Sequence, residues 1–327
     1  MKNKALIVIF LLISSILVTA ATANIDLAYS WLLEQPNTDV FTASLSALAI
    51  SRADPLRTEP YTSYIASKKH TSDACWPSGG CKIKDTSMAL LVESILGLNL
   101  QNTNTENIEN WLISRLVLAP LVGTWNLQIL TQDTGTCNLV YKKRGESESS
   151  PISLSVDKGK ISSSACKDEY FFDLNRCIGG NILFTPATQI EVSCQGLTNS
   201  QISIIYKEGN TLYLLGSPIS TRGIFTINNG FFGNREDTLY ANWALSQIGS
   251  KVNSRLYLKK NQENKVLEKS LLYIITREQT SLSDLISYQT SFAGDFRGSG
   301  ESSSAFNTGI ASLALQESGQ FITELDR

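Results

Sequence analysis

Three stretches of the chain repeat one order of polar and apolar positions. Each copy places a threonine, preceded by an Asp or Asn, eleven positions before a glycine. Asp, Asn and Thr side chains satisfy free amide groups at a helix start, and glycine suits the left-handed position that ends a helix. The pattern therefore predicts three helices that start and end alike. They cover 83–97, 234–249 and 304–319, with Thr86, Thr238 and Thr308 near their starts, and a looser copy begins at Asp39.

The interior of each repeat is largely apolar. In the first copy, the apolar residues of 88–96 lie on nearly every face, interrupted by Glu93 and Ser94. A helix that is apolar all round belongs inside a protein or a membrane, and this one is shorter than the roughly 20 residues that span a bilayer. We therefore expect buried inner helices. Five are predicted, near 39–52, 85–97, 236–249, 265–277 and 305–318.

A second type of helix, apolar on one side only, precedes most of the inner helices. Ile25, Ile108 and Leu282 each begin a run with the i, i+3, i+4 spacing of a helix with one apolar face. A further helix of this outer type is expected over 61–69. A chain that alternates outer and inner helices must stack its repeats on one another to bury their apolar faces.

Two outer helices carry the dipeptide Trp-Leu, at Trp31 and Trp111, and loops with a glycine and an aromatic residue recur between the helices. Those loops are 76–79, 123–125 and 294–296. Inner helices of the type DTSMALLVESILG complete the pattern. In these features the chain resembles the terpenoid cyclases and the β-subunits of protein prenyltransferases, whose α/α toroid is shared by complement-type thioester domains and cobalamin carriers. The resemblance covers roughly 24–122 and 233–319. It implies a mainly α protein, an α/α toroid of about five outer/inner helix pairs that either closes or stays an open crescent.

The segment 122–222 interrupts the helical pattern with short, strand-like runs. Runs of this length, separated by turn residues, are typical of a small antiparallel β-sandwich. They cover 124–131, 137–142, 152–156, 189–194, 201–206 and 211–215. We therefore predict a discontinuous helical domain over 24–121 and 233–327, interrupted by an inserted, disulfide-containing β domain over 122–232.

The first 23 residues have a basic start, an apolar run and a small-x-small end at Ala21 to Ala23, as in a secretory signal peptide. An uncleaved membrane anchor is the alternative, but it needs a longer apolar run. We therefore expect cleavage, no membrane span afterwards, and a secreted or cell-surface protein. Loss of Lys2 and Lys4 leaves 26 of the 28 Lys+Arg against 30 Asp+Glu, a mature net charge of about −4. Without a basic block, nucleic acid is a poor partner.

Six cysteines behind a signal peptide argue for disulfides. Cys75 and Cys81 flank the tight loop CWPSGGC and are expected to pair. The other four fall in the strand-rich segment and are expected to pair among themselves; three connectivities are possible, of which we favour the one that joins Cys177 to Cys194. Zinc is the alternative, but these spacings do not match those of zinc sites, so we predict neither a metal nor a cofactor. The four are Cys137, Cys166, Cys177 and Cys194.

The catalytic devices of the resembled group are missing from the sequence. There is no DxDD motif for substrate protonation and no CGEQ-like thioester sequence. A prenyltransferase-type zinc site needs Asp, Cys and His, whereas the one histidine, His70, lies in a Lys-Lys-His stretch that we expect to be solvated. A single histidine also argues against a Ser-His-Asp or Cys-His triad. The sequence therefore favours a protein without a catalytic site.

Acidic and aromatic residues recur in the loops that lead to the inner helices. In a toroid such loops gather on one rim, where paired acids could bind a ligand or act as general acid and base in glycan cleavage. The plainer interpretation is helix capping. The aromatic residues could stack on a sugar, lipid or peptide, or plug the ends of the helical layers. The candidate rim consists of Asp85, Asp237, Asp295, Glu301, Trp76, Trp125 and Phe296.

We therefore predict a secreted or cell-surface, non-catalytic protein that binds an extracellular glycan, peptide or small molecule, or a surface protein, through the toroid and the β domain. The first alternative is an extracellular enzyme on the same fold, a polysaccharide lyase or hydrolase rather than a terpenoid cyclase. It requires Asp85, Asp237 or Glu301 to converge in one cleft. The second alternative is a structural component of a surface assembly, which requires exposed apolar patches on the β domain.

Overall fold

The computed structural model of the protein describes residues 30, 33–34, 36–52, 54–100, 104–143, 146–178, 188–215, 218–227, 230–250, 254–290, 295–302 and 304–319. The expected signal peptide over 1–23 lies outside these residues, as does most of the outer helix expected from Ile25. Within these ranges, no helix combines the length and the apolar character that a membrane span needs.

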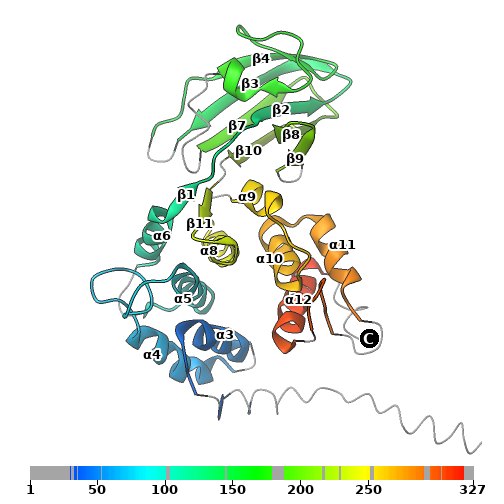
Figure 1. Ribbon diagram of the computed structural model, residues 1–327. Helices are drawn as coiled ribbons and strands as arrows, with labels where there is room; N and C mark the ends of the chain where they lie inside the picture. Colours follow the sequence, from blue (N-terminus) through cyan, green and yellow to red (C-terminus); the bar gives the residue numbers. More distant parts are fainter. Residues whose placement is uncertain are drawn as a thin grey trace, which may run out of the picture.

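The protein is a mixed α/β structure, with 43% helix, 24% strand and several antiparallel sheets. Figure 1 shows most of the helices in one part of the molecule and most of the strands in the other. The expected mainly α fold, an α/α toroid, is therefore wrong. The repeats predict where helices start and end because capping is local. Ring closure depends on contacts between distant helices, which a capping pattern does not specify.

Five helices lie where the repeats predict the inner layer. Asp39, Asn234 and Ser304 cap three of them, each by accepting a backbone N–H with its side chain. Asp85 and Asp237 are not capping residues and lie inside the first turns of their helices. The five are α3 (Val40–Ser51), α5 (Ile83–Leu96), α8 (Arg235–Gln247), α10 (Val266–Thr276) and α12 (Ala305–Ser318).

The threonine of each repeat holds the loop in front of its helix. In each copy the threonine hydroxyl accepts the backbone N–H of an aromatic residue that is at most 1% exposed. The bonds run from Trp76 to Thr86 (3.0 Å), from Phe232 to Thr238 (2.9 Å) and from Phe296 to Thr308 (3.4 Å). The repeated threonine thus fixes a buried aromatic residue against the start of each inner helix.

One-sided helices pack against the inner layer. Three of them lie where outer helices are expected. One is expected over 61–69, and the other two have apolar runs that start at Ile108 and at Leu282. Their buried side chains, such as Leu112 and Leu285, belong to the same hydrophobic cluster as the inner helices. The outer elements are the 3-10 turn η1 (Pro55–Thr58), α4 (Glu59–Ser67), α6 (Thr105–Ser114), α9 (Arg255–Lys260) and α11 (Gln279–Ser287).

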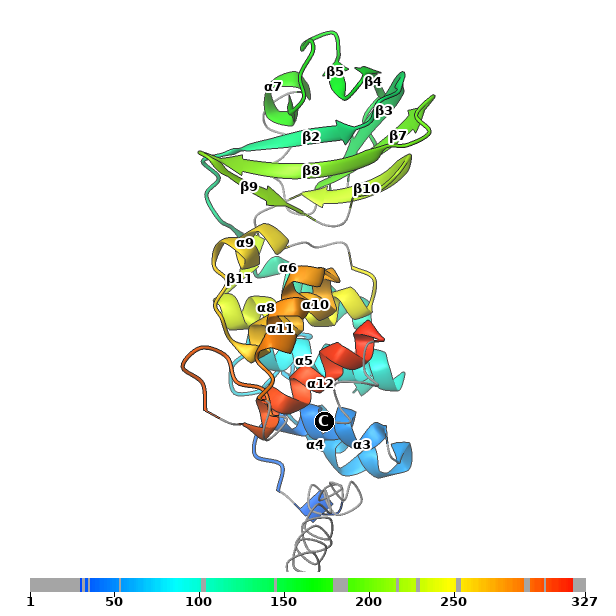
Figure 2. The same ribbon diagram turned by 90° about the vertical axis from the view of Figure 1, so that its right-hand side faces the viewer.

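Two antiparallel sheets form the other part of the molecule (Figure 2). Their strand orders are β10-β7-β3-β4-β5 and β6-β2-β8-β9. Buried side chains from both sheets, such as Trp125 and Leu139, share one hydrophobic cluster. The six runs expected to be strands are all present, as β2, β3, β4, β7, β8 and β9. The elements are β2 (Thr124–Leu130), β3 (Thr134–Lys142), β4 (Ile152–Asp157), β5 (Lys160–Ser162), β6 (Phe172–Asp173), α7 (Leu174–Ile178), β7 (Thr188–Gln195), β8 (Gln201–Glu208), β9 (Thr211–Leu214) and β10 (Arg222–Ile227).

A two-stranded sheet joins the two parts. Strands β1 (Leu116–Leu118) and β11 (Gly230–Phe232) pair antiparallel, with Leu116 opposite Phe232. The chain therefore leaves the helical part and returns to it at one place. The domain boundaries expected at 122 and 232 stay a prediction.

Three disulfides join the six cysteines. The bonds are Cys75–Cys81, Cys137–Cys194 and Cys166–Cys177. The first follows the expectation from the tight loop, whereas the favoured bond between Cys177 and Cys194 is wrong. Cys194 on β7 lies directly opposite Cys137 on β3, and strand partners cannot be read from cysteine spacing. The three bonds indicate an oxidising, extracellular environment.

Candidate functional site

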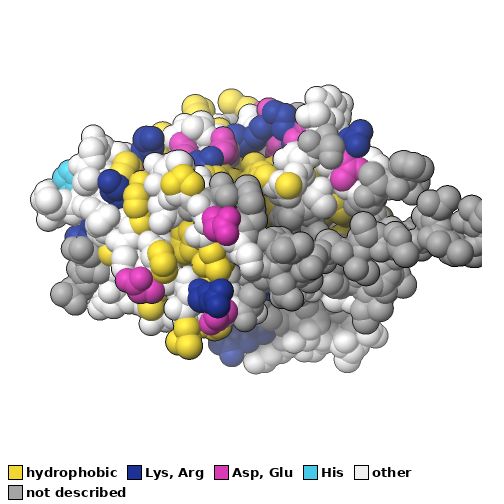
Figure 3. Space-filling view, turned by 90° about the horizontal axis from the view of Figure 1, so that it is seen from below, with side chains coloured by type: hydrophobic (Ala, Val, Ile, Leu, Met, Phe, Trp, Pro, Cys, Tyr) yellow, Lys and Arg dark blue, Asp and Glu magenta, His cyan; other side chains and the backbone are white. Residues whose placement is uncertain are grey.

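A cavity of about 350 Å³, partly open to solvent, lies between the five inner helices. Its walls come from α3, α5, α8, α10 and α12, and most of the side chains in them are apolar. In the view from below Figure 1, hydrophobic side chains gather on one face of the molecule among scattered charged ones (Figure 3). The apolar lining includes Leu45, Leu48, Trp243, Ile274, Ile310 and Leu313.

Helical spacing brings these side chains to one wall. Leu45 and Leu48 on α3, and Arg52 just after its end, follow the i, i+3, i+7 series of one helix face. The lining of α12 follows the same series, with Phe306, Gly309, Ile310, Leu313 and Glu317. A Cβ placed on Gly309 would meet no atom within 4 Å. At this glycine the cavity is therefore bounded by backbone, and a side chain added there would have room to enter it.

Helices α3 and α12 approach each other through side chains near both of their ends. Near their starts, the rings of Phe41 and Phe306 lie 6.4 Å apart between centroids. Near their ends, the guanidinium of Arg52 donates a hydrogen bond of 2.8 Å to the side-chain oxygen of Gln316. The two contacts bracket the lined stretch, so the cavity has an aromatic end and a polar end.

The charges at the polar end do not cancel. Glu317 forms an ion pair of 2.7 Å with Arg277. Arg52 also lines the cavity, but its partner is the neutral amide of Gln316, and no carboxylate in the described ranges lies within ion-pair distance of it. Arg52, which is exposed to solvent, therefore has no carboxylate partner among the described residues and could bind an anionic ligand group.

Two of the predicted acids, Asp85 and Asp237, come together where α5 and α8 begin. Burial raises the pKa of Asp85; Lys82 opposes this rise, and the negative charges of Asp39 and Asp237 add to it. Burial also raises the pKa of Asp237, against a hydrogen bond from the backbone of Lys84 that lowers it. Neither carboxylate lines the cavity. The pair is thus a feature of the helix starts and not of the cavity.

The other two acids bond to the loops around them. One oxygen of Glu301 accepts the backbone N–H groups of Val266 at 3.0 Å and Gly298 at 2.9 Å. Asp295 forms an ion pair of 2.6 Å with Arg297. No contact seen in the described residues joins either carboxylate to the acidic pair at α5 and α8. The four acids expected on one rim therefore form separate local groups.

The three aromatic candidates are packed inside the protein. Trp76 and Trp125 are 0% exposed and Phe296 is 1% exposed. Trp76 donates its indole N–H to the backbone oxygen of Ile65 at 2.8 Å, and Trp125 lies in the cluster between the two sheets. Without an exposed ring face they cannot stack on a ligand in this structure. In this structure the three rings pack inside the protein, and a binding role for them stays a prediction.

Two buried glutamates, Glu93 and Glu268, also lie in the helical part. Burial raises the pKa of Glu93 to about 7, against a hydrogen bond of 3.2 Å from the backbone of Leu100. Burial likewise raises the pKa of Glu268 to about 7, opposed by the backbone of Glu263 and by Arg235. Neither glutamate lines the cavity, so both bear on stability and not on ligand contact.

The sequence candidates do not include the cavity residues. The inner helices are expected to be apolar, so Leu45 or Ile310 carries no signal that separates a cavity wall from a filled core. The one available cue is Arg52, a cation that directly follows the largely apolar helix 40–51.

Comparisons with known proteins identify no relative of this chain. A scan against protein-family models finds no match, and neither do searches of curated proteins and of solved structures. The resemblance to terpenoid cyclases is therefore neither supported nor refuted, and function rests on the geometry of the cavity.

Proposed function

We propose that this protein is a secreted or cell-surface, non-catalytic binding protein that holds an amphiphile in the cavity between its inner helices. The observation that carries the proposal is a space of about 350 Å³ with apolar walls on five helices and a single unbalanced cation at one end. Small-molecule sites are mostly apolar clefts of about 300–1,000 Å³ with a few placed polar groups. The cavity has this size and this chemistry.

The lining defines the ligand class. Leu48, Ile310 and Leu313 favour an aliphatic or isoprenoid body, because burying apolar ligand surface contributes roughly 25 cal/mol per Å². Arg52 favours a carboxylate, sulfonate or phosphate at the end of that body. Glu317 does not oppose such a group, since Arg277 balances its charge. A medium-length fatty acid is the simplest molecule with this pattern.

The extracellular setting is supported by the three disulfides, which form and persist in oxidising compartments. The expected signal peptide at the start of the sequence points the same way. A binding role is favoured over the glycan-cleaving alternative because Asp85 and Asp237, the two acids that come together, lie outside the cavity lining.

The experiment is calorimetric titration of the mature chain with dodecanoate. We expect saturable binding of one molecule per chain. The variant Gly309→Leu places a side chain in the cavity without a backbone clash, and it should weaken binding more than tenfold. Gly79→Leu is the matched control, because Gly79 also has open space around it but lies in a distant loop. Absence of binding by the native chain, or equal binding by Gly309→Leu, would overturn the proposal.

A second candidate function, a component of a surface assembly, is favoured by the edges of the two sheets. Leu212 and Leu214 on edge strand β9 are 51% and 40% exposed, and Ile224 on edge strand β10 is 54% exposed. Exposed apolar edge strands invite pairing with another chain. Sedimentation of the mature chain over a wide concentration range tests this function. Association that Leu212→Lys abolishes would support it, and a monomer at every concentration would remove it.

A further inference from the structure

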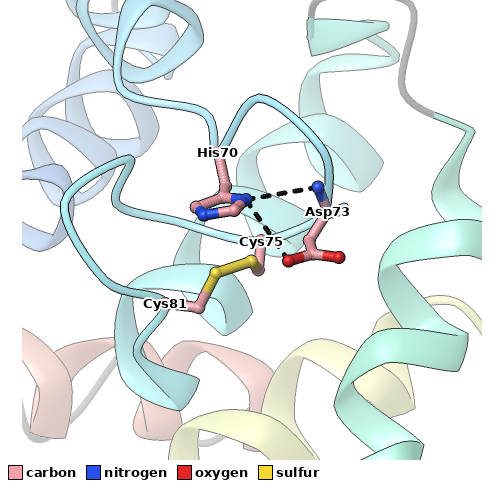
Figure 4. A group of neighbouring side chains, drawn as sticks. All are labelled: His70, Asp73, Cys75 and Cys81. Atoms are coloured by element: carbon pink, nitrogen blue, oxygen red, sulfur yellow. Dashed lines mark hydrogen bonds and ion pairs between the residues drawn. A yellow bond between two sulfur atoms is a disulfide. The ribbon is translucent and has the colours of Figure 1, made fainter.

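The loop between α4 and α5 gathers four side chains of the types that bind transition metals. A ring nitrogen of His70, a carboxylate oxygen of Asp73 and the sulfur atoms of Cys75 and Cys81 all lie within 4.8 Å of one another. Figure 4 shows the imidazole and the carboxylate beside the disulfide. We propose that reduction of the Cys75–Cys81 disulfide turns this loop into a four-ligand zinc site, a function separate from the cavity.

The donor set is one that zinc prefers. Structural zinc sites are tetrahedral and combine Cys sulfur with His nitrogen, and Asp oxygen is a known ligand. In the disulfide form the two sulfur atoms carry no charge and offer no thiolate, so only His70 and Asp73 remain as donors. Opening the bond supplies the other two ligands, and the metal state and the disulfide state exclude each other.

The loop is held in shape by bonds that do not involve sulfur. The backbone N–H of His70 donates to the oxygen of Cys75 at 2.9 Å, and that of Lys82 donates to the oxygen of Trp76 at 2.7 Å. Trp76 is fully buried, and its indole N–H bonds to the backbone oxygen of Ile65. Its own backbone N–H bonds to the hydroxyl of Thr86. These anchors keep the two cysteines and the histidine together after the bond is opened.

The carboxylate is already placed against the histidine. An oxygen of Asp73 lies 3.3 Å from Nδ1 of His70, and the backbone N–H of Asp73 donates to the same nitrogen at 3.3 Å. The Asp73 side chain is about half exposed and that of His70 is 28% exposed. Both side chains can therefore turn toward a metal ion without disturbing the core.

Reduction needs an external dithiol, and the reaction balances with it. A thiolate of the dithiol attacks the sulfur of Cys81 and releases the thiolate of Cys75; the second thiol of the reductant then displaces Cys81 and closes a cyclic disulfide. Two electrons and two protons pass from the dithiol to the protein. Binding of Zn²⁺ by the two thiols then releases two protons.

The Cys75–Cys81 disulfide is more exposed to solvent than the other two. All six cysteines lie in the described part of the chain, and five of them are buried, whereas Cys81 is partly exposed. A dithiol therefore reaches the sulfur of Cys81 before those of the two disulfides in the β part. The loop can change state while the β part keeps its bonds.

The test is titration of the full mature chain with Co²⁺, used as a spectroscopic substitute for zinc, before and after mild treatment with a dithiol. We expect one Co²⁺ per reduced chain, with the charge-transfer absorption of cobalt–thiolate bonds, and none in the oxidised chain. Zinc should displace the cobalt. His70→Ala and Asp73→Asn should each weaken zinc binding more than about tenfold. Loss of a residue that only hydrogen-bonds to a metal ligand already costs about tenfold or more, and these two residues would bind the metal directly.

The control is the double variant Cys75→Ser with Cys81→Ser, which removes both sulfur ligands and leaves the other disulfides intact. The proposal is overturned if this variant binds cobalt as well as the reduced native chain does. It is also overturned if His70→Ala and Asp73→Asn bind zinc with the affinity of the native chain. Thermal unfolding of the reduced native chain gives an independent readout, because a ligand that binds the folded state raises the midpoint. No rise in Tm with added Zn²⁺ also contradicts the site.

Discussion

The guanidinium of Arg52, just after the end of α3, donates a hydrogen bond of 2.8 Å to the side-chain oxygen of Gln316 near the end of α12. The two residues are 264 positions apart, and their bond joins the first and the last of the five inner helices at the polar end of the cavity. An anionic head group would compete with Gln316 for this guanidinium. The proposed amphiphile therefore exchanges a neutral partner of Arg52 for a charged one.

Arg52→Gln should change which ligands the protein binds. The variant keeps a polar side chain but loses the cation, so the affinity for dodecanoate should fall about threefold, the scale of an exposed ion pair. The affinity for dodecanol, which has the same chain without the charge, should stay the same. Calorimetric titration with both ligands measures the difference. Arg57→Gln is the control, because Arg57 pairs with Asp54 away from the cavity; a parallel loss for both ligands would exclude a head-group role.

The repeated threonine should be a stability determinant. Thr238→Val keeps the shape of the side chain but removes the acceptor of the Phe232 N–H, which is buried. A buried donor without a partner costs about 1–3 kcal/mol, so the free energy of unfolding should fall by that amount in a urea titration. Thr211→Val, on an exposed position of β9, should change it by less than about 0.5 kcal/mol. Equal effects would show that the hydroxyl bond is dispensable.

The features that could be predicted from the sequence are mostly local ones, namely helix ends and strands. Glycines end two of the helices in the left-handed conformation, at Gly97 with φ 63° and at Gly319 with φ 71°. The strand-like runs between 122 and 222 are strands because alternation and turn residues act over a few positions. The threonine repeat has a cause that the sequence alone did not show, since Thr86 bonds to the loop aromatic and does not cap its helix.

Long-range relationships could not be predicted. The predictions of an α/α toroid and of a bond between Cys177 and Cys194 were wrong because the sequence does not show which distant segments become neighbours. Predicting the cavity would also require knowing how five helices pack and leave a space at Gly309. Asp85 and Asp237 do come together, but the sequence could not show that they lie outside the cavity.

The buried glutamates should give the protein a stability that depends on pH. The pKa of Glu93 is raised from 4.5 to about 7 in the folded protein, so between these values the folded state holds a proton that the unfolded state has lost. Stability from this group is therefore present at acidic pH and is lost as the pH rises toward 7. Glu268, with a pKa raised to about 7, acts in the same direction.

Glu93→Gln should remove part of this dependence. The neutral amide still accepts the N–H of Leu100 and needs no deprotonation, so the variant should be more stable than the native chain at pH 8 by about 1–3 kcal/mol. At pH 4.5 the two should be nearly equal. Urea titrations at both pH values measure the difference. Glu106→Gln, on the exposed first turn of α6, is the matched control, and a pH profile unchanged in Glu93→Gln would contradict the assignment.

The central claim is that an amphiphile occupies the space between the five inner helices, and fluorescence quenching by a bromine-labelled dodecanoate tests it most directly. Trp243 lines the cavity, whereas Trp76, Trp111 and Trp125 do not. We predict quenching that saturates with ligand and disappears in Trp243→Phe, while calorimetry shows that this variant still binds. Quenching that persists in Trp243→Phe, or that rises without saturation, would place the ligand elsewhere and contradict the account.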